Sequence, residues 1–76
     1  MKLMLVHWMD ANSAAGWTDL HNFEPDHGLT FSVGWLVHED EQCLVLAGTW
    51  DETTETFNNY IQIPKGMIKM EREIWS

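Results

Sequence analysis

The chain has 76 residues, enough for one small domain, and we assign residues 1–76 to a single domain. A domain of this size buries only about 60% of the surface that its unfolded chain exposes, so its core needs additional support. Twelve acidic residues against four basic ones give a formal net charge of -8. This balance argues against binding to double-stranded nucleic acid, because phosphate backbones are bound mainly through lysine and arginine.

The only cysteine, Cys43, cannot form a disulfide within the chain, which indicates a reducing compartment. The apolar N-terminal stretch is short and interrupted by His7, so it is not expected to be a signal peptide. No window approaches the roughly 18 apolar residues of a membrane span. We therefore expect a cytoplasmic protein without membrane contact, supported by homo-oligomerisation.

Residues 2–9 combine apolar side chains without a helical stripe, which predicts a first strand that is buried on much of both faces. Residues 10–28 are rich in Asn, Ser, Gly, Asp and Pro, which predicts a long loop with at most one short helical turn. Long loops in compact domains are often functional.

Residues 29–38 alternate between two sets of side chains and are the clearest strand of the sequence. A second β run at 43–50 follows the acidic turn, so the two segments predict an antiparallel hairpin. Gly34 and Gly48 are candidate bends, since glycine allows close approach of the backbone where a small barrel turns.

Residues 60–63 predict a short strand that Pro64 ends, followed by a tight turn at Lys65 and Gly66. Residues 67–75 alternate as a half-buried final strand does, but their helix propensity leaves a helical end as the alternative. The prediction is a mostly β fold, a small five-stranded barrel with a long loop after its first strand.

Two resemblances support this prediction. The stretch 61–70, Ile-Gln-Ile-Pro-Lys-Gly-Met-Ile-Lys-Met, resembles the end of SH3-like and Sm-like barrels, where a one-turn connection joins the last two strands. Segments at 8–13, with Trp17, and at 32–37, 44–47 and 63–66 resemble short bacteriophage proteins. The resemblance implies an SH3-like barrel of phage origin in the cytoplasm of a host bacterium. Some small phage proteins are anti-defence factors that act as sponges for nucleotide immune signals.

The histidines and the cysteine do not predict a metal or catalytic site. His21 and His27, with Asp26, could meet a metal in the long loop, but they lack the closely spaced Cys or His pairs of structural zinc sites. Cys43 lies at an alternating strand position, where a free cysteine usually acts as a small buried apolar group. We expect no metal and no cofactor.

Enzyme signatures are also absent, because the chain has no Gly-rich phosphate loop, nucleophile elbow or nucleotide fingerprint. A hydrolase built on scattered carboxylates stays open, since sequence does not show their geometry. The prediction is a protein that is not an enzyme.

Five tryptophans are too many for one small barrel to bury, so some are expected to face a subunit interface or a ligand. In the ligand hypothesis, Trp8 and Trp17 flank a turn and form a wall on which a base stacks. Asp10 and Ser13 would add polar contacts, although such residues also commonly cap turns. Lys65 would meet a phosphate or, alternatively, an acidic neighbour.

The first functional hypothesis is a phage anti-defence protein that promotes immune evasion without catalysis. A homo-oligomer would bind and sequester a nucleotide-derived signal, a cyclic oligonucleotide or an ADP-ribose derivative, between its subunits. Its candidate ligand-binding residues are Trp8, Asp10, Ser13, Trp17 and Lys65. The alternative is an acidic phage protein that binds and inhibits a host protein through its negative surface.

Overall fold

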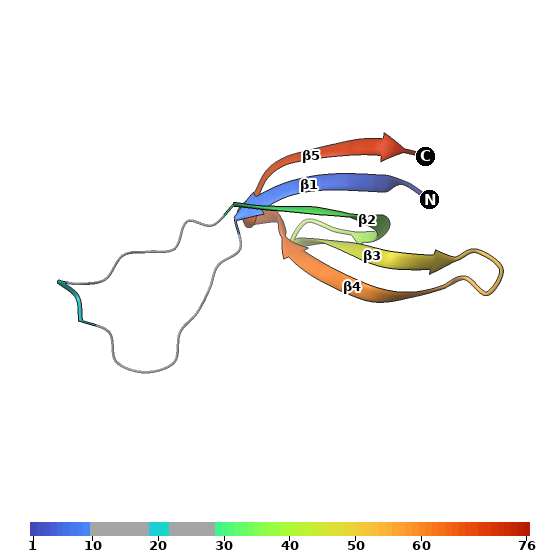
Figure 1. Cartoon of the computed structure of the whole chain (residues 1–76), viewed down its shortest axis with the longest axis horizontal. Helices are drawn as coiled ribbons and strands as arrows, with labels where there is room; N and C mark the ends of the chain where they lie inside the picture. The colour runs from blue at the N-terminus through green and yellow to red at the C-terminus, as the bar shows by residue number, and fades with distance from the viewer. Residues whose placement is uncertain (10–18, 22–28) are drawn as a thin grey trace.

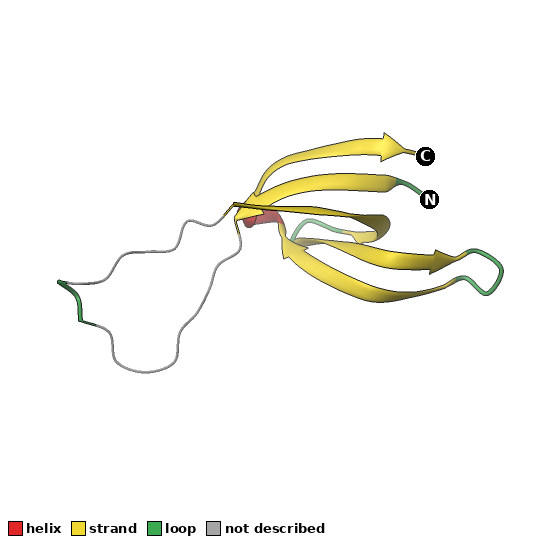
Figure 2. Cartoon of the chain, in the orientation of Figure 1, coloured by secondary structure: helices red, strands yellow, loops and turns green. Residues whose placement is uncertain are grey.

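The computed structural model describes residues 1–9, 19–21 and 29–76 and contains one antiparallel sheet (Figure 1). The sheet order is β4-β3-β2-β1-β5, so β4 and β5 are its two edges. Figure 2 shows that the described residues are mostly strand. The elements are β1 (Leu3–Met9), β2 (Leu29–Glu39), β3 (Cys43–Asp51), β4 (Thr56–Pro64), the 3-10 helix η1 (Lys65–Met67) and β5 (Ile68–Trp75).

The predicted mostly β class with five strands is confirmed, and the sheet does not close into a barrel. Most of the predicted loop at 10–28 lies outside the described residues. Within 19–21, the backbone N–H of His21 donates to the side chain of Asp19 over 2.9 Å. Among the described residues, no helix has the length and apolar character to cross a membrane.

The C-terminal half differs from the prediction in one place, the start of β4, and it decides between the two alternatives for residues 67–75. Strand β4 begins at Thr56 rather than at residue 60, and Phe57 and Asn58 already pair with Trp50 and Thr49 of β3. This stretch is polar, and an exposed edge strand tolerates polar residues. The helical alternative for residues 67–75 is wrong, because β5 is a strand and the 3-10 helix ends at Met67.

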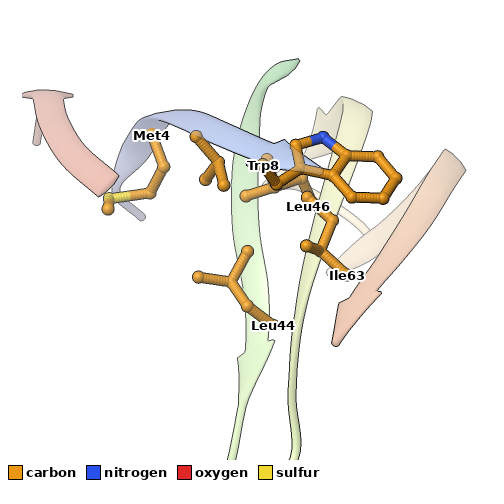
Figure 3. Close-up of a cluster of buried hydrophobic side chains, with 6 residues drawn as sticks. Met4, Trp8, Leu44, Leu46 and Ile63 are labelled. Carbon is orange, nitrogen blue, oxygen red and sulfur yellow. The ribbon is translucent and has the colours of Figure 1, made fainter. Parts of the chain in front are cut away.

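The core shows that the sheet curves on itself (Figure 3). Its buried side chains come from β1, β3 and β4, although β2 lies between β1 and β3 in the sheet. Strands two positions apart lie about 10 Å from each other, so their side chains pack together most closely where the sheet bends and the residue between them is small. The cluster consists of Met4, Val6, Trp8, Leu44, Leu46 and Ile63.

The bend is located in the middle of β2. Gly34 is buried, and a Cβ built on it would lie 2.9 Å from the backbone oxygen of Ala47. The register with β3 shifts between Leu36 and His38, so Val37 forms an irregularity of the bulge type. Glycine and bulge therefore act together to turn β2 across the core.

The more apolar side of the first half of β2 points outward. Phe31 and Val33 are 64% and 57% exposed, whereas the opposite side carries Ser32 and Gly34. Phe31 stacks on His7 of β1 with a ring separation of 4.3 Å. The predicted alternation of β2 is present, but its inner side carries Gly34, which β3 approaches closely, and Ser32, which accepts a hydrogen bond from Trp8 of β1.

We predict that Gly34→Ala destabilises the protein by about 1–3 kcal/mol, since the new methyl group would overlap the β3 backbone rather than a flexible side chain. Gly66→Ala is the matched control, because no atom lies within 4 Å of a Cβ at that position. Its effect should be within about 0.5 kcal/mol. Urea unfolding of both variants measures the difference, and equal effects would contradict the assigned role of Gly34.

Candidate functional site

The candidate residues predicted from sequence have different surroundings. Asp10, Ser13 and Trp17 lie outside the described residues. Trp8 is 6% exposed in the core, where its indole N–H donates to the hydroxyl of Ser32 over 3.0 Å. Its ring therefore packs against the protein, and whether it contacts a ligand stays a prediction.

Lys65 joins the end of β4 to the turn between β2 and β3. Its ammonium group forms an ion pair with Glu39, and its backbone N–H donates to the carbonyl of Gln42 over 2.9 Å. The hydrogen bond to the Glu39 carboxylate raises the pKa of Lys65 above its usual value. Lys65 therefore has an acidic neighbour, Glu39, as the second of its two sequence-based predictions stated.

A hollow of about 450 Å³ lies at the other end of the sheet. Figure 1 shows both chain ends and the β3–β4 hairpin gathered at this end. Three tryptophans from three different strands contribute to its wall. The hollow, which we call the tryptophan pocket, is lined by Met1, Trp35, Trp50, Glu52, Glu55, Trp75 and Ser76.

Strand register brings two of these tryptophans together. Leu3 of β1 pairs with Trp35 of β2 on one side and with Trp75 of β5 on the other. The two indoles meet edge to face, with centroids 5.5 Å apart and an interplanar angle of 81°. This geometry is favoured for aromatic pairs because the positive ring edge faces the negative ring face.

The β3–β4 turn supplies the acidic part of the wall. The side chain of Asp51 accepts a hydrogen bond from the backbone N–H of Thr53 over 2.9 Å, which is the usual way for Asp to organise a turn. Glu55 has a φ of 55°, in the left-handed region. The local backbone thus places Glu52 and Glu55 at the rim, directly after Trp50 at the end of β3.

The lining determines which contacts the tryptophan pocket offers. Indole rings stack on flat ligands and attract cations, and carboxylates accept hydrogen bonds from amines and hydroxyls. None of the described side chains lining the pocket is basic. A phosphate group would therefore find two carboxylates and no basic side chain in this wall.

The five tryptophans are apparent from the sequence, but this pocket was not predicted. Trp50 and Trp75 lie at the C-terminal ends of their strands, which is a signal available from sequence. That Trp35 lies beside them can be predicted only when the strand order is known, because β3 pairs with β2, and β5 is joined to β2 through β1.

The chain was compared with family models, with curated proteins and with solved structures, and none of the three comparisons gave a match.

We predict that Ser32→Ala destabilises the fold by about 1–3 kcal/mol, because the buried indole N–H of Trp8 loses its acceptor. In a Trp8→Phe background, which has no such donor, the same substitution should have a clearly smaller effect. Chemical denaturation of the four proteins gives the coupling between the two sites. Additive effects would show that this hydrogen bond contributes little.

Proposed function

We propose that this protein is a non-enzymatic binding protein whose tryptophan pocket holds the base of a nucleotide-derived ligand. The observation that supports this most directly is the convergence of Trp35, Trp50 and Trp75 on one hollow of about 450 Å³. Pockets that bind small molecules commonly measure about 300–1,000 Å³ and combine apolar walls with a few polar groups. In the setting implied by the phage resemblance, binding would sequester an immune signal.

Stacking would supply most of the affinity. Each base stacked on an aromatic side chain contributes about 1–3 kcal/mol. Trp35 and Trp75 already hold each other edge to face, so little ordering of these rings is needed when a ligand binds. The carboxylates of Glu52 and Glu55 would accept hydrogen bonds from the amino group of adenine or guanine, or from ribose hydroxyls.

The ligand's phosphates would point away from the carboxylates. Lys2 follows Met1 of the pocket wall and lies 3.8 Å from Glu73, as measured between its Nζ and a carboxylate oxygen. This exposed pair is weak enough to exchange partners. A phosphate leaving the pocket on that side would therefore meet a cation.

Homo-oligomerisation is part of the proposal, because both edges of the open sheet are mostly exposed and offer unpaired backbone groups. Pairing of β4 from one copy with β5 of the next would join the sheets of neighbouring copies, and repetition of this contact closes into a ring when the rotation between copies allows it. Such pairing would run along Trp75, so the neighbouring copy would add to the pocket wall. The edges carry the exposed apolar residues Phe57, Tyr60, Ile61, Met70, Ile74 and Trp75.

Binding to a host protein is the second candidate, supported by the pairing of scarce cations with acids. Lys2 pairs with Glu73 and Lys65 with Glu39, which leaves the surface strongly acidic. Attraction by an acidic surface weakens steeply with added salt, whereas stacking in a pocket is less sensitive. The salt dependence of binding therefore separates the two candidates.

We predict that calorimetric titration with cyclic dinucleotides, cyclic trinucleotides and ADP-ribose derivatives reveals one ligand class that binds. Trp50→Leu should weaken binding by about 5-fold to 150-fold, which corresponds to one lost stacking contact. Trp50→Phe should retain most of the affinity. Phe31→Ala is the control, because Phe31 is an exposed aromatic residue outside the pocket lining.

Glu52→Gln and Glu55→Gln distinguish a base from a simple cation. Gln keeps an acceptor and removes a negative charge, so nucleotide affinity should be unchanged or increase, whereas affinity for a choline-like cation should fall. Binding of choline alone, or no binding by any nucleotide tested, would overturn the proposed ligand class. Equal losses in Trp50→Leu and Phe31→Ala would overturn the proposed pocket.

We predict that the protein sediments as a multiple of its 8.9 kDa chain mass. Tyr60→Lys places a charge on the exposed β4 edge and should shift the protein toward monomer, since charged edges oppose strand pairing. Thr54→Lys is the matched control, with the same charge change in the exposed β3–β4 turn. A monomeric parent protein, or equal dissociation in both variants, would contradict edge pairing.

A further inference from the structure

Three potential metal ligands meet at the turn that joins β2 to β3, at the end of the sheet where Lys65 pairs with Glu39. The Nε2 atom of His38 lies 2.8 Å from Oδ2 of Asp40, and the Sγ atom of Cys43 lies 3.8 Å from the same oxygen. The three ligand atoms are all within 4.8 Å of one another. We call this group the turn cluster.

The turn holds the Asp40 carboxylate in a fixed orientation. Its Oδ1 atom accepts hydrogen bonds from the backbone N–H groups of Gln42 and Cys43, over 2.8 and 2.9 Å. The backbone N–H of Asp40 in turn donates to the carbonyl of Cys43 over 3.0 Å. One carboxylate oxygen is thus used by the fold, and the other faces His38 and Cys43.

The donor set identifies a class of ion. Imidazole nitrogen, thiolate sulfur and carboxylate oxygen together suit Zn²⁺, whereas Mg²⁺ and Ca²⁺ take oxygen ligands almost exclusively. Ligating carboxylates are commonly oriented by further hydrogen bonds, and the two backbone N–H groups supply these here. Glu39 and Glu41 flank Asp40 in the sequence and add negative charge near the site.

We propose that His38, Asp40 and Cys43 bind a zinc-class divalent cation, with the fourth coordination position open to water or to another ligand. The ion would occupy the place where hydrogen bonds now join the three side chains. On binding, the Cys43 thiol releases its proton to solvent, and the imidazole of His38 adopts the tautomer that carries its proton on Nδ1, so that Nε2 is free to coordinate. The ion would cross-link the end of β2, at His38, to the start of β3, at Cys43.

The surroundings of the turn cluster shift the pKa values of Asp40 and Cys43 in opposite directions. Hydrogen bonding from His38, and then from the backbone N–H groups of Cys43 and Gln42, holds the pKa of Asp40 far below its usual value. Burial, and secondarily the Asp40 carboxylate, raises the pKa of the Cys43 thiol. Asp40 is therefore ready to coordinate, while Cys43 becomes a ligand when the metal displaces its proton.

The test is titration of chelator-treated protein with Co²⁺, a spectroscopic substitute for Zn²⁺, without oxygen and with a non-thiol reductant. We expect a sulfur-to-cobalt charge-transfer band and the visible bands of tetrahedral cobalt, saturating at one ion per chain. One equivalent of Zn²⁺ should remove both. Zn²⁺ alone should raise the melting temperature, as any ligand of the native state does.

Three variants separate coordination from folding. Cys43→Ala should lose the charge-transfer band, and His38→Gln should lose saturable binding. Asp40→Asn keeps an oxygen for the turn N–H groups, so it should fold but bind cobalt more weakly. His21→Gln is the control, because His21 is an exposed histidine outside the turn cluster.

Absence of the charge-transfer band in the parent protein would overturn the proposal. The same holds if Cys43→Ala keeps the band, or if His21→Gln and His38→Gln lose affinity equally. Thermal unfolding without metal shows whether each variant is folded, and a folded Asp40→Asn variant tests the site even if Cys43→Ala is unstable. The outcome is independent of the tryptophan pocket, which lies at the opposite end of the sheet.

Discussion

The structure depends on one packing contact, in which the inner face of β1 meets the inner faces of β3 and β4 across a bent β2. Val6, Leu44 and Ile63 are completely buried there, although their strands are not all neighbours. Gly34 allows the close approach, because a side chain at its position would meet the backbone of Ala47. Phe31 and Val33 lie on the other side of β2 from Gly34 and are exposed.

Much of the fold could be predicted from the sequence, because strands leave a local pattern of period two. β1, β2 and β3 begin and end within one residue of their predicted bounds, and β5 is a strand as its alternation indicated. The start of β4 could not be predicted, since Thr56 to Asn59 become strand only by pairing with β3. That Phe31 points outward could not be predicted either, because alternation along one strand does not show which of its two faces the core covers.

The candidate sites were harder to predict, since they depend on contacts between distant parts of the chain. Trp35 and Trp75 meet only because both strands pair with β1. His38, Asp40 and Cys43 are close in sequence, but their spacing matches no known zinc pattern, and neither does that of His21 and His27, the histidines weighed as metal ligands from the sequence. The turn cluster was missed because a hairpin turn with one cysteine has no recognised motif. What identifies it is the carboxylate orientation, which sequence does not contain.

The net charge restricts how an acidic protein of this kind can bind a nucleotide. All four Lys and Arg residues are among the described residues, and Lys2 and Lys65 already pair with acids. Affinity from phosphate neutralisation would have to overcome a formal charge of -8, so the base is the part of the ligand that can contribute most. Stacking against neutral indoles is nearly independent of that charge. Under the proposed function, the three tryptophans would therefore bind the base by stacking, which tolerates any base, and a choice between bases would come from the hydrogen bonds to Glu52 and Glu55.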